Sequence, residues 1–192
     1  MPRCLPELWL LRHGQTEWNA AGRLQGRLDS PLTESGLRQA RAQGVILRRI
    51  LPAGVTVLAS PSPRAWRTAE IATEGLGLTV RPDPDLVEID LGIWSGRQAD
   101  EVRSALPPGA PDDLHLWKFD APGGEGLAAM TARLEGVLAR LEGPTVLVTH
   151  GVTSRVLRCL ALGRPVSELS ALPGGQGVVH HVRDGGARTI DA

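Results

Sequence analysis

Short apolar runs alternate along the chain with longer segments in which apolar residues recur every three or four positions. Four runs predict buried β-strands, at residues 8–11, 55–59, 78–81 and 145–148. Helical spacing occupies residues 33–51, 63–73, 127–141 and 152–160. Two final runs, 177–182 and 187–190, predict an antiparallel hairpin. Together they indicate an α/β fold, a three-layer α/β/α sandwich with a mostly parallel sheet and an antiparallel edge.

Turn and capping residues mark the ends of these elements. Thr33 is placed to cap the first long helix, and Ser62-Pro63 combines a capping residue with proline at the first helical position. The pattern weakens between residues 96 and 125, where prolines and glycines leave room for two short helices. We therefore expect one domain over residues 1–192, with residues 96–125 forming an insertion that covers the site.

Composition narrows the class of protein without identifying it. The 192 residues carry 21 cationic and 21 acidic side chains, and Lys118 is the only lysine. A balanced charge disfavours a nucleic-acid partner. No apolar run approaches the roughly 18 residues that span a bilayer, so no membrane partner is expected. Cys4 and Cys159 lack metal-ligand spacing, which favours free thiols and a cytoplasmic location. The oligomeric state stays open, a homodimer included.

Candidate chemistry gathers where strands end. The first strand leads into Arg12-His13-Gly14, and the strand at 145–148 leads into Thr149-His150-Gly151. A third strand leads into a helix whose first turn holds Arg64. The carboxyl ends of parallel strands share one edge of a sheet, where ligands collect. Two histidines and two arginines at one edge, beside helix N-termini, suit a small dianion such as a phosphate ester.

Several ordered motifs carry a family resemblance that covers nearly the whole chain. They are Leu11-Arg12-His13-Gly14-Gln15-Thr16-Glu17-Trp18-Asn19, Gln25-Gly26, Asp29 to Thr33, Ser60 to Ala65 with Thr68-Ala69, Glu88 with Gly92-Ile93-Trp94, Gly123-Gly124-Glu125 and Thr149-His150-Gly151. In this order they resemble the histidine phosphatase superfamily, which includes cofactor-dependent phosphoglycerate mutases.

The resemblance implies a role for each matching residue. His13 would attack phosphorus and carry a phosphohistidine, with its second ring nitrogen donating to a backbone carbonyl. Arg12, Arg64 and His150 would hold the oxygens of the transferring group, together with the Asn19 side chain and the Gly151 amide. Thr16, Gln25 and Gly26 would lie against the substrate. This chemistry calls for no metal and no cofactor.

Glu88 matches the proton donor to the leaving oxygen, although three nearby carboxylates could be mistaken for it: Asp83, Asp85 and Asp90. A carboxyl at its ordinary pKa is a poor acid at neutral pH. Arginines oppose a rise in that pKa, whereas a bound dianionic phosphate favours one. We therefore expect the carboxyl to be tuned in the substrate complex, giving a kcat profile that leans toward acid.

Other conspicuous residues have plainer explanations. His115 is expected to be an ordinary surface or core histidine, and His180-His181 should face opposite sides of a strand. Arg23 and Arg27 suit either solvated surface or substrate contact. Gly126 and Ser95 depart from the family pattern, which often has serine and glutamate there. Both departures bear on specificity.

The sequence therefore predicts a metal-independent phosphatase acting on a small phosphorylated metabolite. The short segment 96–125 and Gly92-Ile93-Trp94 look most like the small bacterial broad-specificity phosphatases. The alternatives are a cofactor-dependent phosphoglycerate mutase and an α-ribazole or sugar-bisphosphate phosphatase. A non-catalytic binder of phosphorylated ligands is disfavoured, because nucleophile, acid and both arginines are all present.

Overall fold

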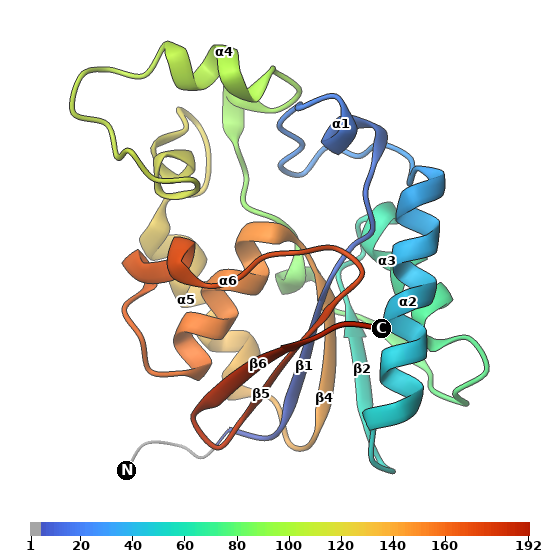
Figure 1. Cartoon of the computed structure of the whole chain (residues 1–192). Helices are drawn as coiled ribbons and strands as arrows, with labels where there is room; N and C mark the ends of the chain where they lie inside the picture. The colour runs from blue at the N-terminus through green and yellow to red at the C-terminus, as the bar shows by residue number, and fades with distance from the viewer. Residues whose placement is uncertain (1–4) are drawn as a thin grey trace.

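The computed structural model describes residues 5–192, so Cys4 lies outside the described residues (Figure 1). Its six-stranded sheet has the order β3-β2-β4-β1-β5-β6. The strands are β1 (Leu8–Arg12), β2 (Thr56–Ala59), β3 (Val80–Pro82), β4 (Thr145–Thr149), β5 (Val179–Arg183) and β6 (Gly186–Ile190). The first four pair in parallel, whereas β5 runs antiparallel to β1 and to β6. The predicted mostly parallel sheet with an antiparallel edge is confirmed.

Helices cover both faces of this sheet. The α-helices are α1 (Glu17–Ala20), α2 (Glu34–Ile50), α3 (Pro63–Thr73), α4 (Ala99–Ser104), α5 (Leu127–Ala139) and α6 (Gly151–Ala161). Short 3₁₀ turns add η1 (Pro84–Leu86), η2 (Gly92–Trp94), η3 (Leu116–Asp120) and η4 (Val166–Ala171). In Figure 1, α2 and α3 lie on one side of the strands, and α5 and α6 lie on the other. The three-layer architecture is confirmed.

Strand β1 shows why an apolar run becomes a central strand. Leu8 and Leu10 face the core shared with α5 and α6, while Trp9 and Leu11 face the core shared with α2 and α3. Successive side chains of a strand point to opposite faces, so a strand covered on both sides must be apolar throughout. The same holds for β4, in which all five residues are buried.

Both predicted helix starts are confirmed, but only one of the two predicted capping residues makes a capping hydrogen bond. Thr33 accepts a hydrogen bond from the Gly36 amide at the start of α2, and Pro63 is the first residue of α3. Ser62 precedes α3 as predicted, but its side chain makes no capping hydrogen bond. The strand expected at residues 78–81 begins two residues later, because it pairs with β2 only from Val80 onward.

The chain leaves neighbouring strands β1 and β4 toward opposite faces of the sheet. After β1 it enters α2 on one face, and after β4 it enters α6 on the other. Such a divergence opens a crevice at the carboxyl edge. Arg12 lies beside Thr149 in the register, and the His13 amide donates to the Thr149 carbonyl at 2.9 Å. The two histidine-bearing loops therefore start from adjacent points.

Segment 96–125 lies at the carboxyl end of the sheet, where Figure 1 shows α4 beside the loop that carries α1. It contains the two short helices that the sequence allowed, α4 and η3. Trp117 of η3 packs against Trp94, with ring centroids 5.6 Å apart. Cys159 is a buried free thiol. Within residues 5–192, no helix is long and apolar enough to span a bilayer.

Candidate active site

A small cavity of about 110 Å³ opens at the carboxyl edge of β1 and β4. Its walls come from the loop after β1, the start of α3, the segment before η2 and the start of α6. Segment 96–125, called the cover below, contributes Lys118. The walls are formed by Arg12, His13, Asn19, Arg23, Leu24, Gln25, Gly26, Arg64, Glu88, Ile89, Leu91, Lys118 and Val152. Seven of the ten residues that the sequence nominated for this site therefore line one cavity.

His13 is held in one tautomer by its own loop. Its ring is 3% exposed, and Nδ1 lies 2.7 Å from the Gly14 carbonyl oxygen, which can only accept a hydrogen bond. The proton therefore sits on Nδ1, and Nε2 keeps its lone pair. The Arg64 Nε–H donates to that lone pair at 3.3 Å. Burial, followed by the nearby His150 and two arginines, lowers the pKa of His13 well below its ordinary value. The ring is thus neutral and nucleophilic at neutral pH.

Close backbone packing holds the Gly14 carbonyl in place. A Cβ atom at Gly14 would lie 2.3 Å from the Gly36 carbonyl oxygen, and one at Gly36 would lie 2.1 Å from the Gln15 carbonyl oxygen. The Gly14 amide also donates to Thr68 Oγ1 at 3.1 Å. Glycine is needed here because two backbones approach closely, and not because of a positive φ.

His150 stands edge-on to His13, with ring centroids 5.2 Å apart and an interplanar angle of 63°. Its Nε2 lies 2.8 Å from Ser60 Oγ, a residue at the end of β2. His150 Nδ1 is buried and has no partner, and it carries the proton when the Ser60 hydroxyl donates to Nε2 in place of Ser62 Oγ, which lies 3.2 Å away. Burial, then Arg64 and Arg12, lowers the pKa of His150 well below its ordinary value. It can therefore serve as a neutral donor to a phosphoryl oxygen.

The two arginines are held differently. Arg64 is 2% exposed; it donates to the Leu28 and Gly26 carbonyls and pairs with Asp29 Oδ1 at 2.9 Å. It therefore fastens the loop of residues 26–29 while presenting Nε to His13. Arg12 is freer, because its buried Nε has no hydrogen-bond partner. Burial lowers the pKa of Arg12, although Glu88 opposes the shift.

A network of amide and hydroxyl groups forms the opposite wall. Asn19 and Thr16 donate to Gln25 Oε1 at 3.2 and 3.0 Å, and Gln176 donates to the Asn19 side chain and to the His13 carbonyl. Thr16 differs from expectation, because it is fully buried and does not line the cavity. Its hydroxyl caps α1 and orients Gln25, so it positions neighbours and does not reach the substrate.

Gly26 and Gly151 contribute through their backbones. Gly26 adopts φ +53°, and its carbonyl accepts from Arg64 at 2.8 Å. Gly151 begins α6, so its amide has no acceptor inside the helix. A Cβ atom there would lie 3.4 Å from the Arg12 guanidinium carbon, so the amide and that guanidinium are neighbours. Gly151 and His150 border the cavity and do not line it.

Glu88 is bound to the start of α6. Its carboxylate accepts from the Val152 and Thr153 amides at 3.1 and 3.0 Å, from the Thr153 hydroxyl at 2.8 Å and from the Ile89 amide at 3.1 Å. Burial raises the pKa of this carboxyl, but these hydrogen bonds outweigh burial and leave the pKa below its ordinary value. The sequence predicted that arginines would keep the pKa of Glu88 low. The structure shows that N–H groups at the start of α6 do so, and the carboxyl is ionised in the free protein.

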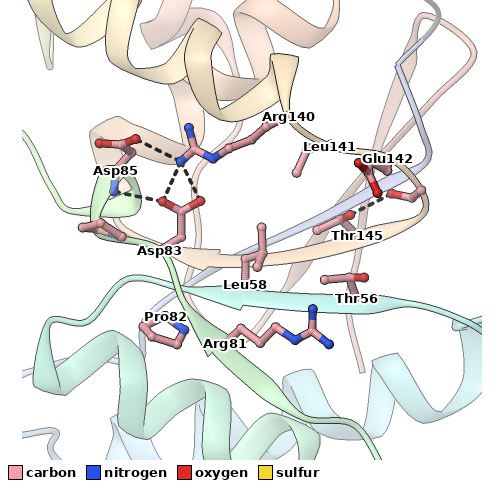
Figure 2. Close-up of a pocket in the computed structure, with 12 residues that line it drawn as sticks. Thr56, Leu58, Arg81, Pro82, Asp83, Asp85, Arg140, Leu141, Glu142 and Thr145 are labelled. Atoms are coloured by element: carbon pink, nitrogen blue, oxygen red, sulfur yellow. Dashed lines mark hydrogen bonds and ion pairs between the residues drawn. The ribbon is translucent and has the colours of Figure 1, made fainter.

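The neighbouring acids are engaged elsewhere. Asp83 and Asp85 bind Arg140 on the wall of a separate cavity of about 580 Å³ beside β2, β3 and β4, as Figure 2 shows. Asp90 accepts from the Gly92 amide and pairs with Arg27. The larger cavity contains no histidine and no unpaired arginine at a helix start. Glu88 is therefore the carboxylate of the histidine-lined cavity.

The sequence interpretation missed the roles of Lys118 and His115 in this region and left that of Arg23 open. Lys118 lines the cavity from the cover, and its Nζ lies 3.2 Å from Nδ1 of His115. Burial lowers the pKa of Lys118 to about 8, and burial with the lysine charge lowers the pKa of His115 to about 3. Arg23 lines the cavity and stacks over Trp18, with its guanidinium 4.3 Å from the ring centre. Lys118 being the sole lysine was a signal, although composition alone could not place it.

The cavity is strongly cationic. Four cations line it, Arg12, Arg23, Arg64 and Lys118, against one carboxylate, Glu88. Within the part of the chain that the structure describes, no group of three or more histidine, cysteine, aspartate or glutamate side chains could hold a metal ion. His180 and His181 face opposite sides of β5 as expected, since His180 contacts Thr189 and His181 contacts Glu7. An excess of positive charge in a small cavity favours an anionic ligand.

Comparisons with known proteins agree with this geometry. The model of the histidine phosphatase superfamily (branch 1) matches residues 8–189. The "Probable phosphoglycerate mutase GpmB" of Cronobacter sakazakii is 38% identical over 180 residues, which are 87% of this chain and 76% of that protein. "Phosphoserine phosphatase 1" of Hydrogenobacter thermophilus is 34% identical over 172 residues, 84% of this chain and 79% of that protein.

Solved structures give the same result. A mycobacterial glucosyl-3-phosphoglycerate phosphatase, solved with VO3, superimposes with a TM-score of 0.76 at 31% identity and covers 97% of this chain and 98% of that one. The chain belongs to the histidine phosphatase superfamily. The predicted family and fold class are confirmed, and so is membership of an enzyme superfamily whose members are phosphatases and mutases.

Proposed function

We propose that this enzyme hydrolyses small phosphomonoesters through a phosphohistidine at His13. The observation that carries the proposal is the His13 ring itself, whose Nδ1 proton is committed to the Gly14 carbonyl while Nε2 lies beside the Arg64 guanidinium. A neutral imidazole with its lone pair next to a cation is poised to meet a phosphorus atom bearing anionic oxygens. When substrate enters, the Arg64 Nε–H donates to a phosphoryl oxygen instead of to His13 Nε2. The lone pair of Nε2 is then free to attack phosphorus.

The first half-reaction forms the bond between Nε2 and phosphorus and breaks the bond between phosphorus and the ester oxygen. Arg12 Nε and His150 Nδ1, both buried without a partner, are the donors left over for the phosphoryl oxygens. Asn19, the Gly151 amide and Arg64 complete the set. Stabilising these oxygens is the main catalytic contribution in phosphoryl transfer. In the second half-reaction, water attacks the phosphohistidine and restores the neutral ring.

Glu88 supplies the proton to the leaving oxygen and later takes one from water. Its carboxylate is ionised in the free enzyme, so it must gain a proton when the dianionic substrate arrives. That requirement supports a kcat profile that falls as the pH rises. A profile that stays flat from acid to alkaline pH would rule out this assignment.

The cation count indicates the class of leaving group. A transferring phosphoryl group neutralises part of the charge of Arg12 and Arg64, and Lys118 and Arg23 remain on the outer wall. We infer that the leaving group is itself anionic, carrying a carboxylate or a second phosphate. The names of the relatives, which include a phosphoserine phosphatase and a glucosyl-3-phosphoglycerate phosphatase, agree with this inference.

A phosphoglycerate mutase is the second candidate, because a relative of that name is 38% identical. A mutase must retain a bisphosphorylated intermediate and turn it over in place. The cavity of about 110 Å³ is small beside the several hundred Å³ that larger ligands occupy, which favours hydrolysis.

The test measures phosphate release from a panel of phosphomonoesters beside conversion of 3-phosphoglycerate in the presence of bisphosphoglycerate. Phosphatase activity predicts release from several members and little isomerisation. Efficient isomerisation with negligible release would establish the mutase instead. Acid-labile labelling from a phosphate donor should be lost in His13→Ala. A protein that binds phosphate but neither labels nor turns over would be a binder only.

A further inference from the structure

A second basic cavity, of about 470 Å³, lies away from the active site. It is enclosed by the C-terminal half of α6, the segment after η4 and the β5–β6 hairpin. Its lining consists of Arg158, Leu162, Arg164, Ala171, Leu172, Pro173, His180, Gly185, Ala187, Arg188 and Thr189. It shares no residue with the cavity beside His13, so the mechanism above does not use it.

The lining contains three arginines and no carboxylate. Arg164 is neutralised from outside the cavity by Glu168 at 2.7 Å, and Arg188 donates to His181 Nδ1 at 3.1 Å. Arg158 has no carboxylate within ion-pair distance among residues 5–192. The cavity therefore has a net positive charge that the described side chains do not balance.

Arg158 is the decisive residue, because its side chain is only 2% exposed. Two of its nitrogens donate to the carbonyls of Ser154 and Pro173, at 3.2 and 2.8 Å. Carbonyl groups satisfy the N–H groups but carry no formal charge. Burial, then the nearby Arg155, lowers the pKa of Arg158 to about 10. A buried guanidinium without a counter-charge is unfavourable, and an anion in the cavity would remove that cost.

His180 and Thr189 add polar groups on the strand side. His180 is buried, and its Nδ1 lies 3.0 Å from the Thr189 hydroxyl. Burial and the charges of Arg158 and Arg155 lower the pKa of His180 to about 3, so the ring is neutral. If the hydroxyl donates to Nδ1, the proton sits on Nε2 and can be given to a ligand oxygen. Apolar walls from Leu162, Leu172 and Pro173 complete the enclosure.

We propose that this cavity is a second ligand site, which binds a small organic anion bearing a carboxylate or phosphate next to a compact apolar body. Arg158 holds the anionic group from the floor, the His180 ring faces it from the strand side, and the leucines contact the apolar part. The planar fork of an arginine suits both oxyanions equally. The site is separate from the substrate site, so its occupancy does not depend on the proposed reaction.

Equilibrium dialysis of the full chain with radiolabelled orthophosphate and with radiolabelled malonate tests the proposal. Phosphate should saturate at two equivalents, one for each cavity, with both anions competing for the second. Arg158→Met should weaken the second equivalent about 10–100-fold, the loss of a charge-assisted hydrogen bond pair, and leave the active-site equivalent intact. The matched control is Arg67→Met, an exposed arginine of α3 that contacts neither cavity.

Ala187→Glu keeps the test decisive if Arg158→Met fails to fold. Ala187 is exposed on β6 and lines the cavity, so a carboxylate there repels an anion without disturbing the core. It should abolish the second equivalent and leave phosphatase activity unchanged. The proposal is overturned if the wild-type chain takes up one equivalent of phosphate and no malonate at millimolar concentrations. It is equally overturned if a second equivalent persists in Ala187→Glu.

Discussion

Gly14→Ala is the most direct test of how the fold prepares His13. The added Cβ atom would lie 2.3 Å from the Gly36 carbonyl oxygen, and 2.8 and 2.9 Å from two further backbone atoms of that residue. Backbone cannot rotate aside as a flexible side chain can. Ordinary contact begins near 3.4 Å, so the loop after β1 must move away from α2 by about 1 Å.

A movement of that size reaches the nucleophile directly. The Gly14 carbonyl holds the His13 Nδ1 proton, and the Gly14 amide is bound to Thr68. Misplacing a reacting group by about 1 Å costs on the order of 100-fold in rate. Overpacking in a tight region costs typically 1–3 kcal/mol of stability. We therefore expect kcat to fall about 100-fold in a chain that is still folded at 20 °C, measured by phosphate release beside a urea unfolding curve.

The control is Gly143→Ala, since a Cβ atom there would meet nothing within 4 Å. That variant should keep both kcat and the urea midpoint of the wild-type chain. A folded Gly14→Ala chain with kcat within about twofold of wild type would falsify the argument that close packing against α2 positions the ring. Loss of folding without loss of specific activity in the folded fraction would contradict it as well.

Three further predictions follow from the site. Glu88→Gln should lower kcat about 10²–10⁴-fold for alkyl phosphates but far less for p-nitrophenyl phosphate, whose leaving group needs no proton; equal losses on both substrates would exclude the acid role. Lys118→Met should raise KM for 3-phosphoglycerate more than for glycerol 3-phosphate, which lacks the carboxylate. Because the pKa of Lys118 is about 8, the wild-type KM for 3-phosphoglycerate should also rise above that pH, and a variant that keeps this rise would refute the assignment. Three buried histidines have lowered pKa values in the folded chain: His13, His150 and His180. As the pH falls below about 6.5, these histidines therefore take up protons in the unfolded chain before they do so in the folded chain. Stability should therefore decrease on acidification, by up to about 1.4 kcal/mol per histidine at pH 5.5, and urea midpoints that are equal at pH 7.5 and 5.5 would contradict this.

Local patterns accounted for the fold because each element obeys a short-range rule. The apolar run at Leu8–Leu11 predicted a strand buried on both faces, and β1 is covered on both faces. Thr33 marked a helix start through its capping hydroxyl and Pro63 through its fixed φ, and both effects depend on neighbouring residues alone. The 3₁₀ turns η1, η2 and η4 were not predicted, because three to six irregular residues carry no detectable period.

Some residues of the candidate site were predictable from local motifs, and others were placed only by long-range contacts. His13, Arg64, Glu88 and His150 were named from strand ends, helix starts and ordered motifs, and the structure brings them together. His115 was taken for an ordinary histidine, yet it contacts Lys118 at the cavity wall. Both lie in the cover, and where an irregular segment folds back over a sheet depends on long-range contacts such as that between Trp94 and Trp117.

The amino-acid order by itself determined the layered fold, the family and the edge of the sheet at which the chemistry gathers, because these follow from periodicity and from residues adjacent in the chain. Only the tertiary structure decided the protonation of the groups involved. The Glu88 carboxyl is held ionised by amides of α6, more than sixty positions further along the chain. Arg158 is buried without a counter-charge by segments that meet only after folding. Charge states depend on burial and on distant donors, and neither is written in a local pattern.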